Sequence, residues 1–183
     1  MGLFPVTILD QQEIQRGLSS LPHDQRQAIE QTAAHQVSLL LASAPQLAHS
    51  PFIDHWDDQD VDTLVKRYRE LPCPALEQDG SCGLYAFRPL TCRSMGIPTE
   101  EAGIVQGACE IQTSIPLIRL SKPLRHEEDL LASAEAEQLS RLRCQQNIRG
   151  EELLLPYAFL PNLAEGGATQ TTRMDTSSHD SSS

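Results

Sequence analysis

Four of the five cysteines of this chain fall between residues 73 and 109, and the fifth, Cys144, stands apart. Isolated free cysteines usually behave as small apolar residues of the core. Here prolines and glycines crowd the segment, so a continuous strand or helix is hard to form. Four thiolates on one metal centre would supply folding free energy to such a segment. We therefore predict a metal site whose ligands are Cys73, Cys82, Cys92 and Cys109.

Disulfide bonds would organise the same segment, but they form in oxidising compartments. The first residues, MGLFPVTILDQQEIQRG, lack the basic flank, long apolar stretch and small-residue cleavage site of a secretory signal. Val6 also stands where a myristoylation signal requires Ser or Thr. We therefore expect a cytoplasmic protein with reduced thiols.

The Asp79-Gly80 pair predicts a tight reversal between the first two cysteines. A two-residue loop there would pair Cys82 with Glu77. It would leave Cys73 roughly 13 Å further along an extended strand, too far away to share an ion. We therefore expect the chain to curl at this point instead of continuing as a ladder.

The stretch RPLTCRSMG predicts a short helix that carries Cys92, with Pro89 in its first turn and Gly96 at its end. The spacings between the four cysteines differ from the C-x2-C pairs of zinc fingers. Spacing by itself therefore does not identify the metal.

The segment CPALEQDGSCGLYAFRPLTCRSMGIP, followed by Cys109, resembles the YkgJ-like cysteine-cluster proteins, a family associated with zinc or iron chelation. The shared pattern is C-P-x-L, an acidic-glycine turn, C-x-x-Y, R-P-x-x-C-R and a later cysteine, over about a quarter of the chain. Many members carry a further C-x-x-C-C group upstream, whereas no cysteine precedes Cys73 here. The resemblance thus implies one four-cysteine site.

Two arginines of the matched motif, Arg88 and Arg93, are placed to offset the negative charge of a four-thiolate centre. Solvated surface cations are the alternative interpretation. We expect Tyr85 and Phe87 to pack over the site and restrict solvent access. We expect Cys144 to be a thiol that does not bind the metal.

Zinc and iron both accept all-thiolate shells. The pattern contains no histidine, which favours an iron-sulfur cluster over zinc. One hypothesis is thus a metal-cluster protein that transfers electrons or senses redox state. The other is a non-catalytic module in which zinc staples a surface for an unknown protein partner. Enzymatic activity has little support, because no G-x-G-x-x-G, P-loop or G-x-S-x-G motif occurs.

Other candidate metal ligands have simpler explanations. Asp58, Asp60 and Asp62 match the start of a calcium loop, but Thr63 replaces its glycine and Arg69 its closing glutamate. The run instead suits the first turn of a helix, where carboxylates complement the dipole. The histidines at positions 55 and 126 have no ligand-spaced partner, so we expect them to be structural.

Amphipathic spacing predicts three helices, at about residues 22–44, 54–70 and 126–143. Pro22 suits the first turn of the first helix, and Ser19 or Ser20 is a candidate cap. The fold class we predict is mainly α: a small helical domain with little sheet and an irregular cysteine-rich metal-binding segment at residues 71–110. The domain is expected to span residues 1–165, and a small, polar tail at 166–183 is expected to be disordered.

The net charge of the chain is -11, which repels phosphate backbones, so we expect no nucleic-acid partner. No stretch approaches the roughly 20 apolar residues that span a bilayer. We therefore expect no membrane segment.

Overall fold

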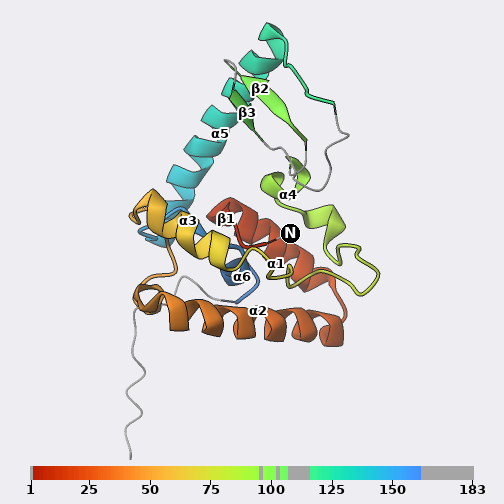
Figure 1. Ribbon diagram of the computed structural model, residues 1–183, viewed down its shortest axis with the longest axis vertical. Coiled ribbons are helices and arrows are strands. Elements are labelled where there is room, and N and C mark those ends of the chain that lie inside the picture. Colours follow the sequence, from red (N-terminus) through yellow and green to blue (C-terminus); the bar gives the residue numbers. More distant parts are fainter. Residues whose placement is uncertain (1, 95–96, 102–103, 107–115, 162–183) are drawn as a thin grey trace, which may run out of the picture.

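The computed structural model describes residues 2–94, 97–101, 104–106 and 116–161, and these residues are mainly helical (Figure 1). This confirms the predicted fold class. The α-helices are α1 (Ile8–Ser20), α2 (His23–Ser43), α3 (Asp58–Arg67), α4 (Leu90–Ser94), α5 (Lys122–Gln146) and α6 (Leu155–Ala158), and two 3-10 turns are η1 (Pro45–Ala48) and η2 (Tyr85–Phe87).

The sheet content of the described residues is small, as predicted. β1 (Pro5–Thr7) pairs antiparallel with β4 (Glu152–Leu154), which joins two segments far apart in the sequence. β2 (Thr99–Glu101) and β3 (Ile104–Gln106) form a separate antiparallel pair. Residues 116–119 run beside β2, since Glu100 N–H donates to Ile118 O over 3.0 Å.

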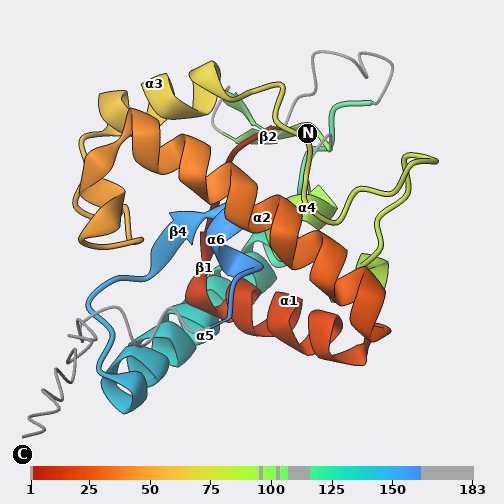
Figure 2. The ribbon, with the colours of Figure 1, turned by 90° about the horizontal axis from the view of Figure 1, so that it is seen from below.

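The core lies between α1, α2 and the carboxyl-terminal β4–α6 segment (Figure 2). Its largest fully buried side chains include Ile8, Ile14 and Leu18 of α1 and Leu40 of α2. Gln15 of α1 binds the end of α6, because its Nε2 donates to the carbonyls of residues 158 and 160 over 2.7 and 3.2 Å. The burial of apolar side chains from both ends of the chain thus stabilises one common core.

Helix α1 was not among the predicted helices. It begins with a capping box, in which the Thr7 hydroxyl accepts from Asp10 N–H and the Asp10 carboxylate accepts from Thr7 N–H. Ser19 and Ser20 end this helix and donate to its own carbonyls. Our assignment of them as caps of α2 is therefore wrong, and the residue before α2 is Pro22, without a side-chain cap.

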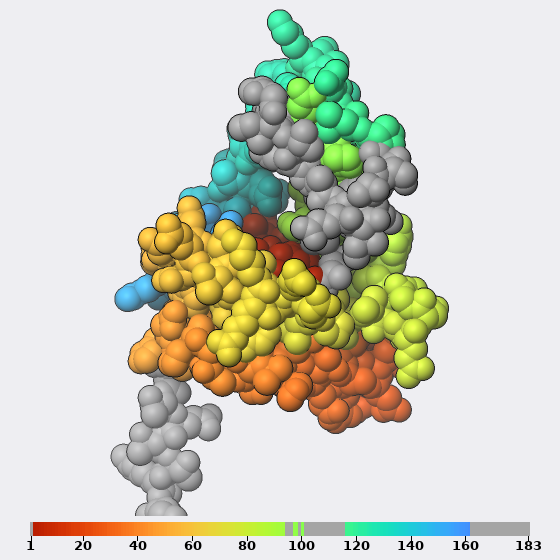
Figure 3. Space-filling model, viewed as in Figure 1, coloured from red at the N-terminus to blue at the C-terminus, as the bar shows by residue number. Residues whose placement is uncertain are grey.

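Helix α5 is longer than predicted, and its apolar stripe is only partly used. Leu139 is buried and Leu142 is half-buried, whereas Leu130 and Leu131 are 57% and 71% exposed. The amino-terminal half of α5 extends away from the core, with β2 and β3 beside it (Figures 1 and 3). Only the carboxyl-terminal half of the stripe therefore packs on the core.

Two further expectations concern the limits of the chain and membranes. The predicted tail at 166–183 lies outside the described residues, and the single-domain boundary at 165 stays a prediction. Among the helices that the structure describes, none combines the length and the apolar character needed to span a bilayer.

Candidate metal centre

The second cysteine, Cys82, lies on one arm of a short hairpin, and the first, Cys73, comes just before the other arm. Its loop has three residues, 78–80, because Gly80 N–H donates to Glu77 O over 3.0 Å and Glu77 N–H donates to Ser81 O over 2.9 Å. Gly80 has φ of +84°, the left-handed conformation that such a loop requires at its last position. The predicted reversal is confirmed, and its extra loop residue places Cys82 opposite Leu76.

The backbone turns at residues 73–76, just before the hairpin, as we expected from the sequence. Leu76 N–H donates to Cys73 O over 3.0 Å, which closes a four-residue turn. Gly83 N–H donates to Ala75 O over 2.9 Å. Because the turn at 73–76 folds back beside the opposite arm, Cys73 returns toward Cys82 instead of lying far down a strand.

The third cysteine belongs to the predicted short helix, which is present as α4, while its predicted end at Gly96 lies outside the described residues. Pro89 directly precedes this helix, and its carbonyl accepts from Arg93 N–H over 3.1 Å. Cys92 is 6% exposed and belongs to the same apolar core as Ala75 and Leu84. These buried side chains therefore tie the described residues 71–94 of the cysteine segment to the helical core.

The three described thiols in this segment are close enough to influence one another electrostatically. The pKa of Cys92 is raised to about 11, chiefly by burial and also by the charges of Cys73 and Cys82, while Arg88 lowers it. Burial also raises the pKa of Cys73, whereas the Ala75 N–H that donates to its sulfur lowers it. Near neutral pH these two thiols are therefore protonated in the metal-free protein.

The two arginines of the motif have different surroundings. The Arg88 guanidinium donates to Cys92 O, lies 5.3 Å from the centre of the Tyr85 ring and lowers the pKa of both Cys73 and Cys92. Arg93 donates from Nε to the carbonyl of Arg88 over 3.0 Å, and from Nη2 to the carbonyl of residue 86 over 2.9 Å. Arg88 thus acts on the thiols through its charge, whereas Arg93 fixes the backbone between η2 and α4.

The two aromatic rings of this stretch lie against Arg88 and against α1, and their cover of the thiols stays a prediction. Tyr85 is 67% exposed and stacks with Arg88. Phe87 packs on α1, where a Cβ atom added at Gly17 would lie 2.9 Å from its ring. The Phe87 ring therefore anchors η2 to the core, and the close contact requires glycine on α1.

The other two cysteines and the acidic run lie elsewhere in the chain. Cys109 lies outside the described residues, and Cys144 is exposed on α5, apart from the other thiols. Within the described ranges, no three side chains of His, Cys, Asp or Glu are arranged to hold a metal ion. The acidic run begins α3, where the Asp57 carboxylate accepts from Gln59 N–H over 2.9 Å, so the capped-helix interpretation is confirmed.

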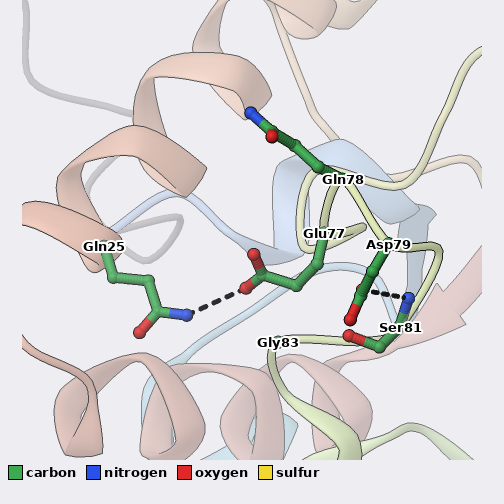
Figure 4. Close-up of a pocket in the computed structure, with 6 residues that line it drawn as sticks. All are labelled: Gln25, Glu77, Gln78, Asp79, Ser81 and Gly83. Carbon is green, nitrogen blue, oxygen red and sulfur yellow. Dashed lines mark hydrogen bonds between the residues drawn. The ribbon is translucent and has the colours of Figure 1, made fainter.

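Two glutamines of α2 hold the cysteine segment, and sequence reasoning missed both. Gln36 Nε2 donates to Pro72 O over 2.8 Å, and Gln25 Nε2 donates to Glu77 Oε1 over 2.9 Å. The second bond crosses an open hollow of about 550 Å³ that the tip of the hairpin forms against α2 (Figure 4). A polar residue inside the apolar stripe of α2, at position 36, was the available signal.

The described residues thus form a small, mainly helical protein in which α2 holds the segment around Cys73 and Cys82 through Gln36 and Gln25, and Arg88 lies near the thiols of Cys73 and Cys92. Comparisons with protein-family models, with curated proteins and with solved structures find no significant match to this chain. The resemblance to the YkgJ-like proteins therefore rests on the motif between residues 73 and 109.

Proposed function

We propose that this protein binds one iron-sulfur cluster or one zinc ion through Cys73, Cys82, Cys92 and Cys109, with a preference for the cluster, and that it transfers electrons or senses redox state. The observation that carries the proposal is that Cys73 in a turn, Cys82 on a hairpin arm and Cys92 in a helix lie near enough for the charges of the first two to raise the pKa of the third. The fourth ligand, Cys109, is proposed from the sequence motif.

The donor set suits an all-thiolate centre. Thiolate ligands select zinc or iron-sulfur clusters over hard cations such as magnesium and calcium. The Ala75 backbone N–H lowers the pKa of Cys73, and N–H groups near ligating sulfurs tune such centres. The guanidinium of Arg88 supplies positive charge beside Cys73 and Cys92, where four thiolates would leave an excess of negative charge.

Protonation adds a second property to this site. The burial that raises the pKa of Cys92 to about 11 keeps its thiol protonated at neutral pH. A metal takes thiolates, so its binding must displace these protons into solvent. Binding should therefore strengthen as the pH rises through the neutral range. Bound iron would supply one-electron chemistry, and bound zinc would supply structural stability only.

Anaerobic isolation of the full chain, followed by metal analysis and a visible spectrum, tests this proposal. We expect either iron with sulfide and a broad visible absorption, or one zinc per chain without colour. Cys73→Ser, Cys82→Ser and Cys92→Ser should each lose most of the metal. Isolation without metal, combined with failure of both zinc binding and cluster reconstitution, would refute the proposal.

The zinc-stapled interaction module is a second candidate, because apolar side chains are exposed on the projecting part of α5. Leu124, Leu130 and Leu131 are 48%, 57% and 71% exposed. Exposed apolar residues that gather in this way are typical of protein interaction sites. Colourless protein with one tightly bound zinc and no redox response would favour this function over electron transfer.

A further inference from the structure

Gln36 occupies an unusual position in α2. Among the described residues it is the one buried polar side chain, with 3% of its surface exposed. It lies on the face of α2 that also buries Ile29, Ala33 and Leu40. An amide placed there costs free energy unless its polar atoms are hydrogen-bonded.

The amide nitrogen of Gln36 binds the backbone directly before Cys73, where the cysteine segment begins. Its Nε2 donates to Pro72 O over 2.8 Å. That carbonyl shares a planar peptide unit with the backbone nitrogen of Cys73, so the bond fixes the plane from which Cys73 starts. The prolines at 72 and 74 restrict φ on both sides of the cysteine. A single hydrogen bond from α2 therefore orients the whole turn at 73–76.

The amide oxygen of Gln36 makes no comparable bond among the described residues. Gln36 Oε1 is buried without a hydrogen-bond partner in the described part of the chain. The side chain lines a hollow between Pro72, Pro74 and the start of the chain that is too narrow to admit a water molecule. An apolar residue of similar length would avoid this cost. Side chains that break a local packing rule are expected where function requires them.

We infer that Gln36 is a positioning residue for the metal centre: it acts through the Pro72–Cys73 peptide to hold the Cys73 thiol where the ligand set needs it. This inference rests on the proposed function. It also makes α2 the element that links metal binding to the helical core. Outer residues that orient a ligand typically change metal affinity by about 10- to 100-fold when they are replaced.

The test compares Gln36→Met with Gln25→Met in the full-length chain. Methionine keeps the length and the apolar stem of glutamine, so α2 should stay folded in both variants. Gln25 is the matched control, because it makes a similar bond from the same helix but to the Glu77 side chain. Two readouts are needed: the rate at which iodoacetamide modifies Cys73 in the metal-free chain, followed by mass spectrometry, and zinc affinity by chelator competition.

We expect Gln36→Met to speed Cys73 alkylation several-fold, to leave Cys144 alkylation unchanged and to weaken zinc binding about tenfold. Gln25→Met should change the Cys73 alkylation rate and the zinc affinity much less. Equal Cys73 rates in wild type and Gln36→Met, or equal effects of the two variants, would overturn the inference. If wild type binds no metal, the proposed function fails by itself, and the Cys73 alkylation rates still decide whether Gln36 positions this thiol.

Discussion

Replacing Tyr157 by phenylalanine should stabilise this protein, although most substitutions in a core destabilise. Tyr157 is 5% exposed in α6, and its hydroxyl has no hydrogen-bond partner among the described residues. A buried unsatisfied hydroxyl costs about 1–3 kcal/mol. Phenylalanine keeps the ring and removes that group, so we expect the free energy of unfolding to rise by about 1–2 kcal/mol near pH 8.

The same substitution should change the alkaline limb of the stability curve. Burial raises the pKa of Tyr157 to about 12, above the ordinary value of 10.0, so the unfolded chain ionises first. Ionisation of this group therefore leaves the free energy of unfolding unchanged below pH 10 and lowers it as the pH rises from 10 to 12. By pH 11 the free energy of unfolding of wild type has fallen by about 1.4 kcal/mol through this ionisation, and that of the phenylalanine variant has not.

Urea unfolding followed by circular dichroism, under reducing conditions at pH 8 and pH 11, measures both effects. Tyr68→Phe is the control with the opposite sign, because the Tyr68 hydroxyl donates to Leu39 O over 3.0 Å and lies 2.6 Å from Ser43 Oγ. That variant should lose about 1 kcal/mol at pH 8. A destabilised Tyr157→Phe, or a gap from wild type that does not widen at pH 11, would refute the reasoning.

Three further predictions concern the cysteine segment. Arg88→Gln should weaken zinc binding about tenfold and Arg93→Gln should weaken it less, as measured by chelator competition, because only Arg88 acts on the charges of the thiols; equal losses would argue against this distinction. Cys144→Ser should leave the metal content of anaerobically isolated protein unchanged, since this thiol lies apart on α5; loss of metal would place it among the ligands. Gly80→Ala should lower the free energy of unfolding by about 1 kcal/mol in urea titrations, because φ is +84° there although the surrounding space is open; a neutral effect would mean that the loop relaxes.

The parts of this fold that were predictable are those coded by neighbouring residues. Helices α2, α3 and α5 follow from apolar spacing, and α4 follows from Pro89 and the short run after it. Helix α1 was missed because its few buried residues are separated by polar ones and by Gly17, a poor helix former. Its capping box of Thr7 and Asp10 was visible in the sequence.

The contacts that position the site were less predictable, because they join segments distant in the sequence. Strands β1 and β4 have three residues each, too few to show alternation, and they pair across most of the chain. Nothing local identifies Pro72 as the partner of Gln36, or Glu77 as that of Gln25. The cysteine cluster was visible from residue type alone, whereas the separate roles of the two motif arginines required the three-dimensional arrangement.

X-ray absorption spectroscopy of the anaerobically isolated protein, at the edge of the metal it contains, is the most direct test of a four-thiolate centre. We expect a first shell of sulfur alone, at about 2.3 Å for zinc, with an additional iron shell if a cluster is bound. A first shell containing nitrogen or oxygen ligands in place of sulfur would contradict it, as would the same all-sulfur shell in a variant that lacks Cys73, Cys82 and Cys92.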